Sequence, residues 1–208
     1  HTGALAGSDE VFSAALKRVG VLRVDTINDL FNMAEIIAKQ PSPSGPKLAI
    51  VTNAGGPGVI ATDALVESEG ELAKLSEKTY EALNQILPKE WSHNNPIDIL
   101  GDAKPDLYAG TIEKVIEDKN VDGVLVILTP QYMTEPKETA LSIKKFSQEN
   151  EKPFLASWMG AEVVEEGKRI LLNENIPCFD FPDDACKTFS YMWRHSYSLR
   201  GIYETPAL

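Results

Sequence analysis

The stretch that decides the fold is Leu48-Ala49-Ile50-Val51-Thr52-Asn53-Ala54-Gly55-Gly56-Pro57-Gly58. An apolar run of strand length passes directly into a glycine-rich turn, and apolar residues then continue at helical spacing through Leu65. Pro57 suits the first turn of a helix, where its missing donor costs nothing. The stretch therefore predicts a buried strand, a tight turn and the beginning of a helix.

The predicted turn has the chemistry of an anion site. The first amides of a helix have no partner within the helix, and the helix dipole adds partial positive charge there. Glycines let the backbone come close to a phosphate. The turn is not a Walker loop, since no Lys-Ser/Thr pair follows, and its glycine spacing is wrong for the dinucleotide fingerprint. These residues leave two interpretations open, an anion site and a purely structural turn.

Strands and helices alternate along the rest of the chain. The nearly continuous apolar run 121–128 is typical of a strand covered on both faces. We expect strands at 47–52, 72–75, 96–99, 121–128, 154–158 and 178–179, with helices between them that include 136–150 and 161–174. This pattern predicts an α/β fold, a doubly wound and mostly parallel sheet with helices on both faces. Ligands of such sheets bind outside the carboxyl ends of the strands, where the glycine turn lies.

A short helical lead-in is predicted before the sheet. Ser8 caps a first helix that ends at Gly20, and Asp25-Thr26 opens a second helix. Gln40-Pro41-Ser42-Pro43-Ser44-Gly45-Pro46 is the strongest breaker in the chain and the best candidate for a linker. We therefore divide the chain into a lead-in at residues 1–40 and a flavodoxin-like domain at residues 41–208.

Composition excludes several classes of function. The chain has 20 basic and 31 acidic residues and a net charge of −11, so we expect no nucleic-acid partner. No apolar run approaches membrane-spanning length, and we expect a cytoplasmic protein. Cys178 and Cys186 are expected to be reduced and structural, and no metal motif is visible. Because the chain opens on His1 and lacks an initiator methionine, we expect it to be part of something longer.

Other chemical candidates each have a structural alternative. His1 lies in a segment of small residues that would suit a mobile nucleophile, although a terminal histidine is more often a purification remnant. Asp98 and Gln131 lie at the predicted carboxyl edge, and each could instead serve a turn or the backbone. His93 and His195 have no ligand spacing around them, and we interpret both as structural. A cluster of C-terminal aromatics is expected in the core or an interface: Phe179, Phe181, Phe189, Tyr191, Trp193 and Tyr197.

Together these segments resemble the NDP-forming acyl-CoA synthetases, relatives of succinyl-CoA synthetase typified by ADP-forming acetyl-CoA synthetase. The matching stretches, in the family's order, are His1-Thr2-Gly3-Ala4-Leu5-Ala6-Gly7-Ser8-Asp9, Asn53-Ala54-Gly55-Gly56-Pro57-Gly58-Val59, Asn95-Pro96-Ile97-Asp98, Leu128-Thr129-Pro130-Gln131, and Phe179-Asp180-Phe181-Pro182 through Tyr203-Glu204-Thr205-Pro206. The resemblance implies a ligase-type flavodoxin-like domain that follows the end of a preceding domain.

The resemblance also implies a mechanism and partners. An acyl phosphate passes its phosphoryl group to a mobile histidine, matched by His1, and then to ADP. The glycine turn would steady the phosphohistidine, which gives Asn53, Gly55, Gly56 and Gly58 a phosphate-binding role and places Asp98 and Gln131 at the edge of the site. The full enzyme would also need CoA-binding and ATP-grasp domains or subunits, a small acyl substrate, CoA, ADP or ATP, and Mg. We expect none of these cofactors to be bound by this chain alone, and a homo-oligomer stays open.

Two other functions remain alternatives. One is a non-catalytic regulatory synthetase-like region of a protein acetyltransferase, in which the phosphorylated histidine is typically lost. The other is a stand-alone flavodoxin-like module that binds an anion or nucleotide. A histidine within His1-Thr2-Gly3-Ala4-Leu5-Ala6-Gly7 favours the enzyme.

Overall fold

A computed structural model describes residues 8–147 and 151–203. In chain order its elements are α1 (Asp9–Arg18), α2 (Ile27–Lys39), β1 (Lys47–Thr52), α3 (Gly55–Glu67), β2 (Glu71–Leu72), α4 (Glu77–Ile86), β3 (Ile97–Asp98), α5 (Pro105–Ile116), β4 (Gly123–Leu128), α6 (Pro136–Ile143), the 3-10 turn η2 (Lys144–Ser147), β5 (Phe154–Trp158), the 3-10 turn η3 (Ala161–Val164), α7 (Glu165–Asn173), β6 (Cys178–Phe179) and α8 (Pro182–Tyr203). The segment 1–7, which contains His1, lies outside the described residues, as does the tail 204–208.

The strands form a parallel sheet in the order β2-β1-β4-β5-β6, and β3 also pairs with β1. Apart from the added β3, this is the strand order of flavodoxin-like folds. In the register of the two central strands, Val51 lies opposite Val126 and Thr52 opposite Ile127. The α/β fold predicted from the sequence is therefore confirmed.

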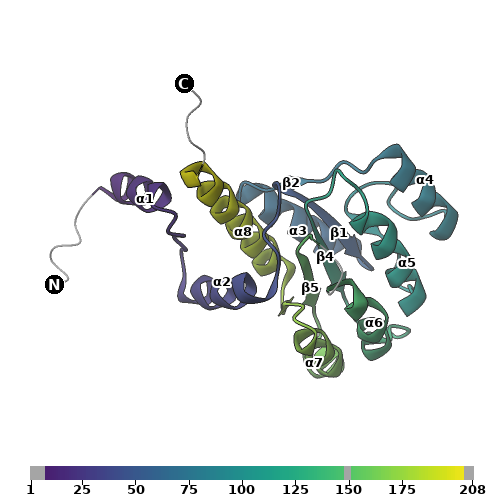
Figure 1. Cartoon of the computed structure of the whole chain (residues 1–208). Helices are drawn as coiled ribbons and strands as arrows, with labels where there is room; N and C mark the ends of the chain where they lie inside the picture. Colours follow the sequence, from purple (N-terminus) through teal and green to yellow (C-terminus); the bar gives the residue numbers. More distant parts are fainter. Residues whose placement is uncertain (1–7, 148–150, 204–208) are drawn as a thin grey trace.

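Helices cover both faces of the sheet, and each face has its own core. On one face α4, α5, α6 and α7 pack against alternate residues of the strands. On the other face α3, α8 and α2 pack against the remaining residues. The two groups of helices are visible on opposite sides of the sheet in Figure 1. Every residue of β4 is buried, as the apolar run 121–128 predicts for a strand covered on both faces.

The outer edge of β1 is covered in three pieces. β2 pairs with its first residues and β3 with its last, and the Asn95 side chain fills the space between them. Asn95 Oδ1 accepts from the Ile50 amide at 2.9 Å, and its Nδ2 donates to Leu48 O at 2.9 Å and to Ala73 O at 3.0 Å. The polar residue of the Asn95-Pro96 motif therefore has a structural task, because its side chain takes the place of strand pairing.

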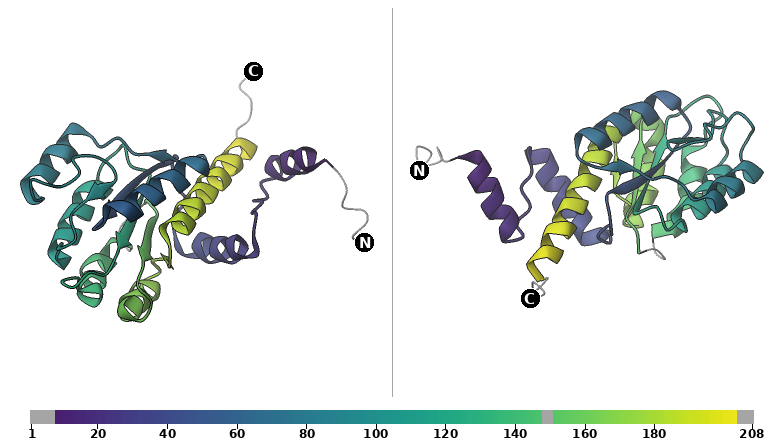
Figure 2. Two further views of the ribbon diagram at one scale, coloured as in Figure 1. Left: turned by 180° about the vertical axis from the view of Figure 1, so that it is seen from behind. Right: turned by 90° about the horizontal axis from the view of Figure 1, so that it is seen from above.

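The two lead-in helices differ in how they attach to the domain. α1 has no buried residue and lies at the end of the molecule farthest from α4 (Figure 2). α2 is held firmly, since Met33 and Ile36 are at most 3% exposed and belong to the core of the α8 face. The Thr26 side chain and Asp29 form a capping box at the start of α2. Only α2 is thus integrated into the fold of the domain.

The proline-rich segment after α2 is packed, which modifies the expectation of a linker. Gln40 is 8% exposed, and its Nε2 donates to Asn175 O at 2.6 Å while its Oε1 accepts from the Phe154 amide at 2.8 Å. Further along, Pro43 O accepts from Ser196 Oγ at 3.2 Å. The prolines do end α2, but side chains distant in sequence then fix the segment to the domain.

Some predicted ends of elements differ from the structure. The helix expected at 136–150 is α-helical at Pro136–Ile143 and continues as η2, where Phe146 packs in the core beside Phe154, while residues 148–150 lie outside the described residues. The helix expected from Ala161 begins as η3, directly after Gly160, whose φ is 132°. Both cysteines are free thiols, and burial raises the pKa of Cys178 to about 12.

Candidate functional site

The carboxyl ends of β1 and β4 meet where the winding of the sheet reverses. The helix that follows β1, α3, packs on one face, and the helix that follows β4, α6, packs on the other. The two connections therefore diverge at neighbouring strand ends, which is the place where open α/β sheets bind ligands. The glycine turn follows one of these strand ends.

Two main-chain donors of the turn have no acceptor. α3 begins at Gly55, and Ala54, the residue before it, provides no side-chain cap. The Ala54 amide donates to Thr52 Oγ1 at 3.1 Å, and the Gly58 amide donates to Ala54 O at 3.3 Å. For the amides of Gly55 and Gly56 we find no acceptor within residues 8–147 and 151–203, and both residues are exposed. The helix dipole adds positive charge at this point, so the turn can accept an anion.

The three glycines of the turn have different surroundings. A Cβ on Gly56 would meet nothing within 4 Å, whereas a Cβ on Gly58 would lie 3.2 Å from Thr52 Cγ2 and 3.3 Å from Pro96 Cβ. Gly58 is buried and lets α3 pack closely against the end of β1. Since its amide is also bonded, Gly58 shapes the turn, and the free donors belong to Gly55 and Gly56.

Asn53 connects the ends of β1 and β4. Its Nδ2 donates to Thr129 O at 2.8 Å, and its Oδ1 accepts from the Thr129 amide at 2.8 Å. The residue is 2% exposed. Both polar atoms of the carboxamide predicted to bind phosphate are therefore bonded to the backbone after β4, and these bonds fix the position of the turn.

Asp98 and Gln131 both lie beside the turn, as predicted for the edge of the site. A Cβ on Gly55 would lie 3.3 Å from Asp98 Oδ2, while Asp98 Oδ1 accepts from the Leu100 amide at 2.9 Å. Gln131 Nε2 donates to Asn53 O at 3.4 Å. Burial, reinforced by the negative charge of Asp98, raises the pKa of Tyr108 beneath the site, so this phenol stays protonated. A carboxylate thus already stands close to Gly55.

The other candidate residues lie elsewhere. His1 is outside the described residues. His93 is held by Asn84 Oδ1 at 3.1 Å and Lys89 O at 2.8 Å, as a structural histidine would be. His195 borders a cavity of about 530 Å³ between α1 and α8, away from the turn. Among the described residues, no group of three or more His, Cys, Asp or Glu side chains could hold a metal ion, and no helix could cross a membrane.

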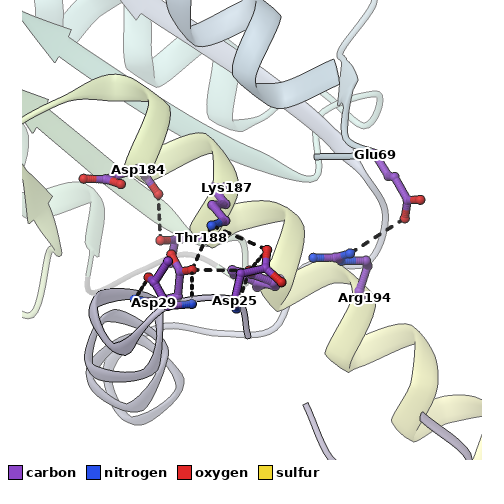
Figure 3. Close-up of polar contacts among 9 residues, drawn as sticks. Asp25, Asp29, Glu69, Asp184, Lys187, Thr188 and Arg194 are labelled. Carbon is purple, nitrogen blue, oxygen red and sulfur yellow. Dashed lines mark hydrogen bonds and ion pairs between the residues drawn. The ribbon is translucent and has the colours of Figure 1, made fainter. Parts of the chain in front are cut away.

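A second polar cluster joins α2 to α8 (Figure 3). Lys187 Nζ lies 2.8 Å from Asp29 Oδ2 and 3.6 Å from Asp25 Oδ2, and the Tyr191 hydroxyl donates to Asp25 at 2.9 Å. Burial opposes ionisation of Asp29, but hydrogen bonds from Lys187 and Thr26 outweigh it and lower the pKa of this carboxyl. The same contact raises the pKa of Lys187. We call Asp25, Asp29, Lys187 and Tyr191 the α2–α8 clamp.

Several of these partners could not be seen in the sequence. Thr129, Thr52 and Pro96 belong to stretches that the sequence marks, but they lie on separate segments, and no local pattern shows that they contact the turn or its support. The alternation of strands and helices did indicate that the ends of β1 and β4 share an edge, which is the signal that could have paired Asn53 with the segment after β4.

Two family models match this chain. The model of the Ligase-CoA domain matches residues 48–199, and the model of the succinyl-CoA ligase-like flavodoxin domain matches residues 1–37. A structure of the dinucleotide-forming acetyl-coenzyme A synthetase 1 of Candidatus Korarchaeum cryptofilum, in complex with phosphate and ADP, is similar with a TM-score of 0.89 at 27% identity. That match covers 100% of this chain and 45% of the other.

Curated relatives include ADP-forming ligases. An acetate–CoA ligase II subunit alpha of Pyrococcus furiosus is 40% identical over 190 residues, which cover 89% of this chain and 41% of the relative. A 4-hydroxybutyrate–CoA ligase of Nitrosopumilus maritimus is 36% identical over 196 residues, which cover 94% of this chain and 28% of the relative. The chain therefore spans less than half the length of these relatives.

Proposed function

We propose a function from the premise that this chain belongs to the Ligase-CoA domain family. It is part of an ADP-forming acyl-CoA ligase, which interconverts acyl-CoA, ADP and phosphate with a carboxylic acid, ATP and CoA. The role of the chain is to receive a phosphoryl group at the glycine turn. The single observation that carries this role is the pair of free, exposed amides of Gly55 and Gly56 at the beginning of α3.

The phosphoryl group would travel on His1. A neutral imidazole nitrogen attacks the phosphorus of the acyl phosphate, the bond from phosphorus to the acyl oxygen breaks, and the carboxylate leaves. Later an oxygen of ADP attacks the same phosphorus, and the phosphorus–nitrogen bond breaks to give ATP. Between the two steps the amides of Gly55 and Gly56 would donate to the phosphoryl oxygens, at no cost to the hydrogen bonds of α3.

Asp98 would decide which anion the turn accepts. Its carboxylate stands beside Gly55 and repels the negative charge of a free phosphate. A phosphohistidine also brings the second ring nitrogen, whose N–H can donate to a carboxylate. We therefore assign Asp98 a preference for a phosphoryl group carried on an imidazole.

The remaining parts of the reaction belong to the whole protein. CoA, the nucleotide and Mg would be held by CoA-binding and ATP-grasp domains or subunits, as the family resemblance implies. The names of two relatives support a divided enzyme, since both are subunits alpha of acetate–CoA ligases. The acyl group would be chosen there too, and the enzyme would act in the cytoplasm.

The test is phosphorylation of the whole protein that contains this chain. With ATP labelled on the γ-phosphate we expect an acid-labile, base-stable adduct, and we expect His1→Ala to abolish it. His195→Ala is the matched control, because this histidine borders the cavity between α1 and α8 and should leave the label unchanged. Undiminished label in His1→Ala would remove His1 from the mechanism.

A further inference from the structure

Helix α2 has a buried face that belongs to the Ligase-CoA domain. Asp29, Met33 and Ile36 recur at intervals of four and three residues, and each is at most 4% exposed. Met33 and Ile36 lie in the core with α8, and the α2–α8 clamp adds the charged contacts of Asp29 (Figure 3). This face is complete within the chain.

The opposite face of α2 is also apolar, and the described residues leave it exposed. Ile27 is 75% exposed, Leu30 55%, Phe31 69% and Ile37 48%. Successive members of this set are three, one and six residues apart, and exposed Ala34 lies between Phe31 and Ile37. In an α-helix this spacing places all of them along one side. A helix that is apolar on two sides is typical of an element packed between two layers.

The family matches indicate what completes this second face. Residues 1–37, which include most of α2, match a flavodoxin-like domain, but the described part of that range, residues 8–37, contains two helices and no strand. A flavodoxin-like domain needs a parallel sheet on which its helices pack. Relatives such as that from Nitrosopumilus maritimus are several times longer than this chain, which leaves room for such a sheet.

We propose that the Ile27, Leu30, Phe31 and Ile37 face of α2 is the docking surface for the sheet-bearing remainder of the succinyl-CoA ligase-like flavodoxin domain. α2 is then shared, with one face in each domain, and the two domains are joined as a rigid pair. This inference rests on the family matches and is independent of phosphoryl transfer.

Labelling of single cysteines tests the docking surface. Phe31→Cys is compared in the 208-residue chain and in the whole protein by its rate of reaction with a maleimide. Val163→Cys on η3 is the control, since Val163 is 67% exposed and Phe31 69%. The native thiols contribute little background, because burial raises the pKa of Cys178 and of Cys186.

We expect Phe31→Cys to react at least about tenfold more slowly in the whole protein than in the chain, while Val163→Cys reacts at similar rates in both. Equal rates for Phe31→Cys, or equal slowing at both positions, would overturn the proposal. Labelling of the isolated chain that slows with protein concentration, together with a doubled mass by light scattering, would assign the face to a second copy and overturn it too. The phosphorylation of His1 is unaffected by any of these outcomes, so the two proposals fail separately.

Discussion

Asn53 and Thr129 are joined by two hydrogen bonds of 2.8 Å each, one in each direction, across the ends of β1 and β4. The amide and the carbonyl of Thr129 are therefore both paired, and the turn that follows Asn53 is fixed relative to the neighbouring strand. The residues that support the turn are therefore already ordered, and a ligand does not have to order them on binding.

Replacement of Asn53 should break the link between the ends of β1 and β4 and destabilise the chain. Asn53→Ala leaves the Thr129 amide and carbonyl without their partners. Because Asn53 is buried and Thr129 half-buried, we expect the free energy of unfolding to fall by about 1–3 kcal/mol. Urea denaturation followed by circular dichroism measures this loss. Asn53→Asp keeps an acceptor for the Thr129 amide but loses the donor, and it should also destabilise. Wild-type stability in both variants would contradict the assigned role.

Alanine at the two ends of the turn should act in opposite ways. Gly56→Ala meets no neighbour within 4 Å and places a better helix former in the first turn, so we expect stability to be unchanged or to rise by up to about 1 kcal/mol. Gly58→Ala crowds Thr52 and Pro96 and should lower the free energy of unfolding by about 1–3 kcal/mol. Thermal unfolding of the pair measures the contrast, and a Gly58→Ala variant as stable as Gly56→Ala would show that the packing around Gly58 is loose.

Removal of the carboxylate beside the turn should favour free phosphate. Asp98→Asn takes away a negative charge close to Gly55, and we expect inorganic phosphate to bind about tenfold more tightly to the isolated chain. Amide chemical shifts of Gly55 and Gly56 during a phosphate titration report the change. Glu71→Gln is the control, because Glu71 lies opposite Lys47 at the first residue of β1, whereas Asp98 lies opposite Thr52 at its last. An unaltered affinity in Asp98→Asn would speak against the preference assigned to Asp98.

The α2–α8 clamp should stabilise the chain over the pH range in which Asp29 is ionised and Lys187 is protonated. The pKa of Asp29 is lowered from 3.8, so its contribution is present above about pH 4 and lost as pH falls through its folded-state pKa. The pKa of Lys187 is raised from 10.5, so its contribution is present below that pH and lost as pH rises above it. We expect Lys187→Met to cost about 1.5–3 kcal/mol at pH 7 and progressively less toward either extreme, in urea unfolding curves. A cost that stays constant from pH 3 to pH 11 would show that the ion pair does not contribute.

The segment after α2 should resist proteases although it is rich in proline and serine. Its backbone is held by Gln40 and by the contact of Ser196 with Pro43, so limited proteolysis followed by mass spectrometry should find no early cut within residues 40–46. Gln40→Ala leaves the Phe154 amide without its acceptor and should both destabilise the chain and expose the segment to cleavage. Early cleavage of the wild type here would restore the interpretation of a flexible linker.

The fold could be predicted where its signals are local. The apolar run before Thr52 and the glycines after it indicate β1 and the start of α3, and unpartnered amides follow from the geometry of any helix start. The continuous apolar run of β4 likewise marks a central strand. These inferences need no knowledge of distant residues, which is why the architecture was visible in the sequence.

Contacts between distant residues account for the parts that were not visible. Asn53 carries a carboxamide, a group that can bind an anion. Its partner Thr129 lies 76 residues away, and the sequence does not show that the oxygen and the nitrogen of the carboxamide both bond to it. Gln40 stands in a run of turn-forming residues, yet its partners are 135 and 114 residues away. The residues of the second apolar face of α2 can be read from the sequence. The sequence does not show which of the two apolar faces the domain buries, so it could not identify the exposed one.

The borders of the sheet have a consequence for self-association. β2 and β3, which cover one side of β1 together with the Asn95 side chain, and β6 on the far side each contain two residues. A long row of unpaired amides and carbonyls is what recruits strands from other molecules into fibrils. With both margins so short, the described sheet offers little template for the addition of a strand from another molecule.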